Sequence, residues 1–237
     1  MKQRRFQFSN LGITRGALIV LGLELGVSLI WLLSNQQARA EIGPWIVSYP
    51  SNVFENGRVW TLVTSPLLED KFISLLMLAF VMWMFIPTLE RFWGTARFYR
   101  FVIATSLAGT ICGNLAGWAL GTDQLINGLS PFLYASFVAF GMVYAKQPVR
   151  FFGVLPLTGR QLMYGIIGFL ILFVVLQQLW ALGASYAGAM GMAALMVSKF
   201  SPSLLWKKWR IRRARAKLTV MQGGAAKKRP EEQKYLN

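Results

Sequence analysis

The sequence contains no histidine, one cysteine and little charge. Its 237 residues are 14% charged and 55% hydrophobic, whereas soluble domains carry about 25% charged residues. Without histidine the chain cannot form a Ser-His or Cys-His nucleophilic pair or a histidine-ligated metal site. The single Cys112 excludes an internal disulfide and a cysteine zinc site. A soluble enzyme is therefore disfavoured, and we expect no cofactor and no metal.

Long apolar runs are what the chain has instead. A membrane-spanning helix needs about 20 mostly apolar residues, within a range of about 17–25. Six stretches qualify, and they are Ala17–Leu33, Phe72–Thr88, Phe101–Gly121, Gly128–Ala145, Leu162–Leu179 and Ala181–Ser198. The first is too long for a signal peptide and five more follow it. We therefore expect an all-α, multi-pass integral membrane protein with six transmembrane helices.

The basic residues predict how these helices are oriented. The net charge is +16, and 22 of the 25 Lys and Arg lie in the N-terminal segment, the second and fourth connections and the tail. Because cytoplasmic segments are rich in Lys and Arg, we expect both termini in the cytoplasm. The predicted organisation is a basic N-terminus at 1–16, a membrane domain at 17–200 with a long outer loop at 34–71, and a basic, partly disordered tail at 201–237.

The basic tail predicts contact with lipid. Each basic residue beside anionic inner-leaflet headgroups contributes about 1 kcal/mol. The residues expected to make this contact are Lys207, Lys208, Arg210, Arg212 and Arg213. A basic tail can also bind nucleic acid, which we do not expect in a protein with six membrane spans.

Small residues predict close helix packing in two spans. Gly109, Gly113, Gly117 and Gly121 recur every four residues in the third span, so that another helix can approach closely. In the last span, the small residues include Gly183 and Gly188. These glycines indicate either helix packing within the chain or packing against another chain, by self-association into a homo-oligomer or in a hetero-oligomer.

Glu24 lies in the middle of the first span. An ionisable side chain at that depth is a functional hypothesis by default. The alternative is a protonated, hydrogen-bonded structural residue. No span offers a basic partner.

Three stretches together resemble the rhomboid family of intramembrane serine proteases. The first runs from Arg58 to Glu69, in the sequence RVWTLVTSPLLE, and is followed by LERFWG at 89–94. The second, GLSPFLYA at 128–135, looks like the family's Gly-x-Ser-Gly nucleophile motif with a following Tyr-Ala. The third, ALGASYAG at 181–188, is similar to its His-x-Gly-Gly-x-x-x-Gly motif. Over residues 17–200 the resemblance implies a six-helix rhomboid-like bundle.

The resemblance also implies that the catalytic positions are vestigial. Ser130 keeps the nucleophile position and Tyr134 its flanking tyrosine. The other positions differ, with Ala181 for the histidine, Ser74 and Leu78 for the oxyanion-binding His and Asn, and Pro131, which lacks an N–H, for the Gly. A serine without a base is not a nucleophile, so we expect no catalytic residue. Ser130 is also a favoured N-cap residue type at a helix start.

Three functions follow from these observations. The first is a non-proteolytic rhomboid-like pseudoprotease that binds transmembrane segments of client or partner proteins, through Ser130, Tyr134, Trp60 and Glu24. The second is a structural subunit of a larger membrane complex, and the third an active protease with an unusual base. Short loops favour a prokaryotic cytoplasmic (inner) membrane.

Overall fold

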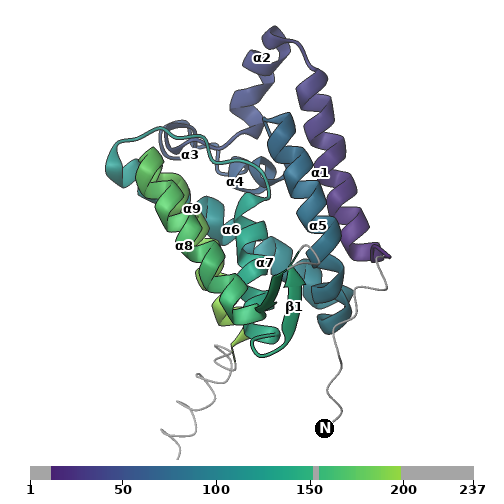
Figure 1. The fold of residues 1–237 in the computed structure, drawn as a ribbon. Coiled ribbons are helices and arrows are strands. Elements are labelled where there is room, and N and C mark those ends of the chain that lie inside the picture. Colours follow the sequence, from purple (N-terminus) through teal and green to yellow (C-terminus); the bar gives the residue numbers. More distant parts are fainter. Residues whose placement is uncertain (1–11, 152–154, 199–237) are drawn as a thin grey trace, which may run out of the picture. The chain divides into compact units, whose positions relative to one another are not determined.

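The computed structural model describes residues 12–151 and 155–198, which are mostly helical. The helices are α1 (Arg15–Leu33), α2 (Gln36–Ile46), α3 (Pro50–Phe54), α4 (Thr61–Thr64), a 3-10 turn η1 (Ser65–Leu67), α5 (Phe72–Trp93), α6 (Thr95–Leu120), α7 (Ser130–Val143), α8 (Gly159–Gln177) and α9 (Trp180–Val197) (Figure 1). The predictions for the N-terminal residues 1–11 and for the lipid-contacting tail residues 207–213 fall outside the described part of the chain.

Five of the described helices, α1, α5, α6, α8 and α9, are long and apolar enough to cross a membrane. In lipid every backbone polar group must be paired within the protein, and a helix achieves this within one segment. The predicted fourth span is shorter than expected, because α7 has 14 residues, or about 21 Å at 1.5 Å per residue. The hydrocarbon core is about 30 Å thick. Helix length therefore supports five of the six expected transmembrane helices and does not confirm the sixth.

A short hairpin departs from the expected all-α fold. Strand β1 (Pro148–Phe151) pairs antiparallel with β2 (Leu155–Thr158), with Pro148 opposite Thr158. The hairpin joins α7 to α8. It lies at the end of the bundle where α1 begins (Figure 1). We call the opposite end, which carries α2, α3, α4 and η1, the loop end.

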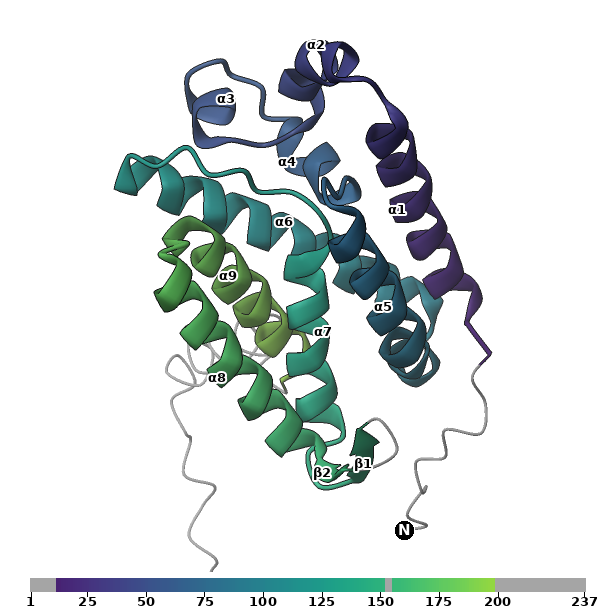
Figure 2. The same ribbon diagram turned by 45° about the horizontal axis from the view of Figure 1, so that its top comes forward.

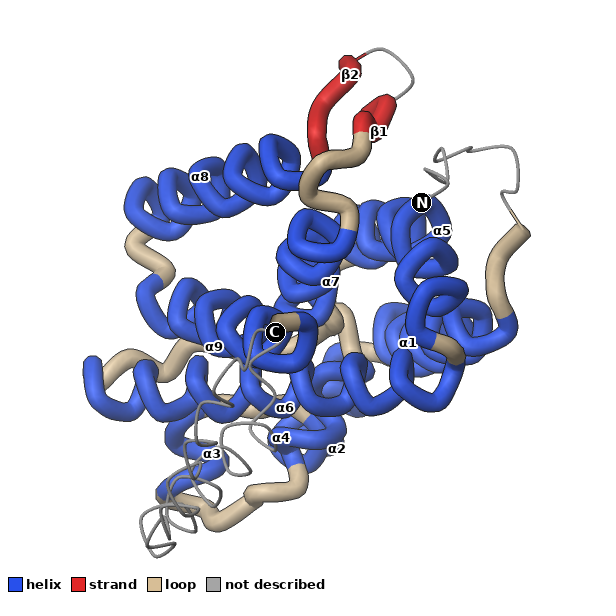
Figure 3. Tube along the Cα trace, turned by 90° about the horizontal axis from the view of Figure 1, so that it is seen from below, coloured by secondary structure: helices blue, strands red, loops and turns tan. Residues whose placement is uncertain are grey.

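The long helices pack in a definite order. Helix α6 packs most extensively on α9, α9 also packs on α7, and α1 packs on α5. Helix α8 lies mainly against α7, whereas α5 contacts α1, α6 and α7. As a result α7 lies between α8 and α5, as two views agree (Figures 2 and 3). The main core includes the fully buried Ile86, Phe98, Phe101, Phe132 and Phe140.

The glycines of α6 lie against other parts of the same chain. A Cβ on Gly113 would stand 2.5 Å from Ile126 and 2.8 Å from Ser185, and one on Gly109 would meet Pro131. Gly117 is similarly close to Pro50 and the backbone of Thr122. This part of the stripe is covered within the chain and is not available for self-association.

The remaining glycines of the two stripes have different surroundings. Gly121 does not belong to the packed face, because it is the C-cap of α6 with φ +64 and has open space around it. In α9, Gly183 lies against Val174 of α8 and Gly188 against Cys112 of α6. Helix α9 therefore uses its small residues to approach two different helices.

Glu90 of α5 caps the start of α1. Its carboxylate accepts hydrogen bonds from the backbone N–H groups of Gly16 (3.0 Å) and Ala17 (2.7 Å) and from the hydroxyls of Thr14 and Thr95. The first N–H groups of a helix have no hydrogen-bond partner within that helix. Glu90, which belongs to the neighbouring helix α5, supplies the acceptor for two of these groups in α1. A Cβ on Gly16 would stand 2.6 Å from this carboxylate. The arrangement fixes α1 on α5.

Candidate functional site at the loop end

The chain enters the short helix α7 through a segment that is tied to the loop end. The N–H of Ile126 donates to the carbonyl of Ser48 (3.1 Å), and the N–H of Gly128 donates to the carbonyl of Ser65 (3.0 Å). Gly128 has φ +74, and the Glu69 carboxylate occupies the space that a Cβ would need. Only glycine fits both conditions. The start of α7 is thus held directly beside Glu69.

Two buried carboxyl groups meet near this point. Glu24 of α1 and Glu69 of the connection before α5 are 0% and 5% exposed and interact electrostatically. Neither carboxyl oxygen of Glu24 has a hydrogen-bond partner; the backbone N–H of Leu129 approaches but does not reach hydrogen-bond geometry. The N–H of Glu69 donates to the hydroxyl of Ser28 at 2.9 Å. The Leu129 N–H is the donor nearest to the Glu24 carboxyl, and both the structural and the functional interpretation of Glu24 stay predictions.

The Glu69 carboxyl titrates near neutral pH. Its burial, followed by the neighbouring Asp70 carboxylate, raises its pKa from 4.5 to about 7, and Lys71 opposes this rise. Asp70 itself accepts a hydrogen bond from the side-chain amide of Asn127 (3.2 Å). Two acidic side chains and one basic side chain therefore adjoin one another in sequence just before α5. Nothing in the expected site pointed to Glu69 as a titrating group.

Helix α7 presents a half-exposed face at the same end. Ser130, Leu133 and Tyr134 are partly exposed, whereas the other residues from 131 to 141 are buried. We call these three residues the α7 face. The Tyr134 ring packs on Tyr186 of α9, with ring centroids 4.7 Å apart. Within the described part of the chain, no hydrogen bond is made by the hydroxyls of Ser130 and Tyr134.

The other positions expected at this site lie on α5 and α9, and both of these helices contact α7. Ser74 of α5 is half-buried and Leu78 lies in the core. Ala181 is buried with its Cβ toward Gly117 of α6. That Ser130, Ser74 and Ala181 line a common interior stays a prediction.

The sequence reasoning missed Ser185, one turn after Ala181. Its backbone carbonyl and the Pro131 ring would both be close to a Cβ on Gly109, so Ser185 is the α9 residue level with the start of α7. The Ser185 side chain is fully buried and its hydroxyl has no hydrogen-bond partner among the described residues. A polar residue amid the small residues of the last span was the available signal.

Trp60 belongs to a separate part of the loop end. Its ring stacks on Trp45, with centroids 6.0 Å apart, and its indole N–H donates to the Trp45 carbonyl at 3.0 Å. No contact between described residues joins Trp60 to Glu24 or to the α7 face. Trp60 is thus held by Trp45, and its part in binding a partner stays a prediction.

The apolar helices define an integral membrane protein that crosses the bilayer several times. Residues 17–198 match the model of the family described as "Eukaryotic integral membrane protein (DUF1751)", and the chain belongs to this family. No curated protein matches the chain.

This membership corrects two expectations. The assignment to the rhomboid family is wrong, because the family found is DUF1751. The glycines that suggested rhomboid motifs have local packing reasons, since Gly128 makes room for Glu69, Gly183 for Val174 and Gly188 for Cys112. A prokaryotic inner membrane is also not supported, because the family is described as eukaryotic.

Proposed function

We propose that this protein is a non-enzymatic membrane protein that binds the transmembrane helices of partner proteins at the α7 face. The observation that carries the proposal is the pair of hydroxyls of Ser130 and Tyr134. They lie half-exposed and without hydrogen-bond partners among the described residues, at the start of a short helix inside a membrane bundle. Polar groups in lipid gain from a hydrogen bond across a helix interface, by about 0.6 kcal/mol on average and up to about 1.7.

The position of α7 supports this proposal. It lies between α5 and α8 (Figures 2 and 3), and these two helices pack mainly on other helices rather than on each other. A partner helix can therefore approach the α7 face from the side. We expect partner helices that carry a polar side chain, placed near the terminus that lies beside the loop end of this bundle.

The proposal includes α7 as a sixth, short membrane element and places both termini in the cytosol. The excess of Lys and Arg in the segments around both termini supports this orientation. The hydrogen bonds that tie Ile126 and Gly128 to the loop satisfy backbone groups that bare lipid would leave unpaired. A cysteine at exposed Asn56, in a Cys112→Ala background, should react with an impermeant maleimide in sealed vesicles of native orientation only after the lumenal face is opened.

The absence of catalysis rests on the lack of a base. The chain has no histidine, and no described residue accepts the Ser130 proton. Pro131 removes one backbone N–H next to Ser130. General-base help is typically worth 10²–10⁴-fold, so Ser130 should not react with a fluorophosphonate probe. Labelling that disappears in Ser130→Ala would contradict this part of the proposal.

Photocrosslinking at Leu133 tests the binding site. A photoreactive amino acid at Leu133 should capture membrane-spanning partners, and addition of Tyr134→Phe should reduce the yield. The matched control places the same amino acid at Ile30 of α1, which is 71% exposed. Equal yields at both positions would overturn the α7 face as the binding site. Capture of one stoichiometric partner would indicate the structural-subunit function instead.

A further inference from the structure

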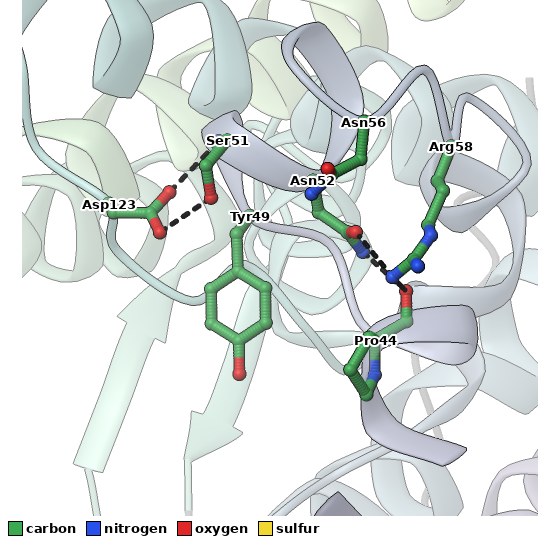
Figure 4. A pocket seen from close by; sticks show the side chains of 7 residues that line it. All are labelled: Pro44, Tyr49, Ser51, Asn52, Asn56, Arg58 and Asp123. Atoms are coloured by element: carbon green, nitrogen blue, oxygen red, sulfur yellow. Dashed lines mark hydrogen bonds between the residues drawn. The ribbon is translucent and has the colours of Figure 1, made fainter. Parts of the chain in front are cut away.

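A polar cavity of about 410 Å³ lies at the loop end. Its lining residues are Pro44, Tyr49, Ser51, Asn52, Asn56, Arg58 and Asp123 (Figure 4). Six of them come from the connection between α1 and α5, and Asp123 follows α6. The volume falls within the range of about 300–1,000 Å³ that small-molecule sites occupy.

Arg58 forms the cationic side of this cavity. Its Nη1 donates to the Pro44 carbonyl (3.0 Å) and to Asn52 Oδ1 (3.1 Å), and its guanidinium lies 4.5 Å from the centroid of the Trp45 ring. A guanidinium has five N–H donors. Nη1 uses its two in these hydrogen bonds, so the one on Nε and the two on Nη2 remain for a ligand. Asn52 is 3% exposed and also donates to the carbonyls of Pro44 and Val47. The positive charge is therefore held in place by buried polar contacts.

Asp123 forms the anionic side. Its two oxygens accept from the N–H (3.0 Å) and the hydroxyl (2.7 Å) of Ser51. Each carboxylate oxygen has a second acceptor position, so both can still bind a cation. Tyr49 lies between the two sides (Figure 4). Burial, then the Asp123 and Asp70 carboxylates, raise the pKa of Tyr49, so its hydroxyl stays protonated as a donor.

Exposed aromatic side chains accompany the cavity, three on the connection between α1 and α5 and Trp118 in the last turn of α6. The pairs are Trp45 with Trp60 and Phe54 with Trp118, each between 43% and 61% exposed. Aromatic residues of this kind concentrate at the headgroup level of a bilayer. The cavity is therefore at the depth where lipid headgroups lie.

We propose that this cavity binds a zwitterionic phospholipid headgroup, with its phosphate on Arg58 and Tyr49 and its ammonium on Asp123. An anionic headgroup without an amine would leave Asp123 unpaired and repelled. The inference is independent of helix binding at the α7 face, because no contact among the described residues joins the two sites. Free phosphocholine offers the same chemistry, and the experiment separates it from lipid.

Native mass spectrometry of the purified full-length protein tests this site. The protein is mixed with equal amounts of phosphatidylcholine, phosphatidylethanolamine and phosphatidylglycerol in detergent, with soluble phosphocholine as a separate arm. We expect retention of the two zwitterionic lipids over phosphatidylglycerol. Binding of phosphocholine without retention of either lipid would overturn the assignment to a headgroup.

Variants locate the effect in the cavity. Asp123→Asn keeps an acceptor for Ser51 and should abolish the preference over phosphatidylglycerol. Arg58→Gln should weaken retention of zwitterionic lipid about ten-fold, since hydrogen bonds to charged groups contribute about that much. Tyr49→Phe removes only a hydroxyl without a partner among the described residues, so it tests the site even if Arg58→Gln fails to fold.

Two exposed residues supply matched controls. Lys71→Gln and Glu55→Gln remove the same charges on the same end of the bundle but lie outside the lining. They should leave the lipid preference unchanged. Equal loss in these controls, or an unchanged preference in both Asp123→Asn and Tyr49→Phe, would overturn the proposal.

Discussion

Individual carboxyl groups determine much of the chemistry at both ends of this bundle. Toward the loop end, Glu24 and Glu69 are buried together, and among the described residues only the backbone N–H of Leu129 comes near the Glu24 carboxyl. At the other end, Glu90 is equally buried but accepts four hydrogen bonds. An unpaired buried polar group is costly, whereas a fully bonded one stabilises. The two ends should therefore respond oppositely to loss of a carboxylate.

Glu69 should make the stability of the protein depend on pH. Its pKa is 4.5 in the unfolded chain and about 7 in the folded one. Between these values the folded state holds a proton that the unfolded state has released, so the stabilisation is complete below pH 4.5 and is lost as the pH rises through 7. The free energy of unfolding should fall by up to about 3 kcal/mol between pH 5 and pH 8.

Thermal melting in detergent at these two pH values measures the effect. Glu69→Gln should remove most of the difference, and exposed Glu55→Gln should preserve it. An unchanged pH profile in Glu69→Gln would show that other groups cause the dependence.

Replacement of Glu90 should destabilise the contact between α1 and α5. In Glu90→Gln one amide oxygen replaces a carboxylate that accepts from four donors, so some of these donors lose their partner. We expect the free energy of unfolding to fall by about 1–3 kcal/mol in total. The melting temperature should fall accordingly. Glu41→Gln on the exposed surface of α2 is the control. A variant as stable as this control would argue against the capping role.

At the scale of elements, small residues explain the central helix pair. Gly109, Gly113 and Gly117 have no room for a Cβ, and Gly188 of α9 makes room for Cys112 of α6, so the two helices approach closely at their small residues. The four-residue spacing in the sequence indicated close packing. It did not indicate that Gly121 is required for a positive φ at the end of α6, because spacing carries no information on where a helix stops.

A bulky side chain at Gly113 should disrupt this helix pair. Gly113→Leu forces Ile126 and Ser185 apart, and overpacking of this kind costs about 1–3 kcal/mol or more. The matched control is Gly168→Leu, since Gly168 of α8 has open space around it and leucine favours helix over glycine. Thermal melting should show a loss for the first variant only. Equal melting temperatures would mean that the helices separate without cost.

For the whole molecule, hydropathy predicted the membrane class and the limits of α1 and α9 closely, but it ended α5 five residues too early and began α6 six residues too late. The first apolar run, Ala17–Leu33, corresponds to α1 at Arg15–Leu33, and the last, Ala181–Ser198, to α9 at Trp180–Val197. The predicted run at 128–145 extends two residues beyond α7 at each end, because hydropathy marks apolar residues and not the loop contacts that end a helix. The hairpin β1–β2 was missed for the same reason.

The candidate site was only partly predictable. Ser130 and Tyr134 do lie on the first turns of the short helix α7, but Glu24 lies in the middle of α1 and Trp60 is part of a different contact set. The burial of Glu69 and Ser185 was not predictable from the sequence, because it depends on tertiary contacts with Ser28, Gly109 and Gly128. The family assignment failed because glycines placed for packing imitate a catalytic motif.

Association with model helices in lipid vesicles tests the central claim most directly. Energy transfer is measured between the labelled, reconstituted protein and two synthetic transmembrane helices, one with Asn and one with Leu near the loop-side end. The account predicts about three-fold stronger association with the Asn helix, and loss of this preference in the Ser130→Ala, Tyr134→Phe double variant. Equal association with both helices, or a preference that survives the double variant, would contradict the account.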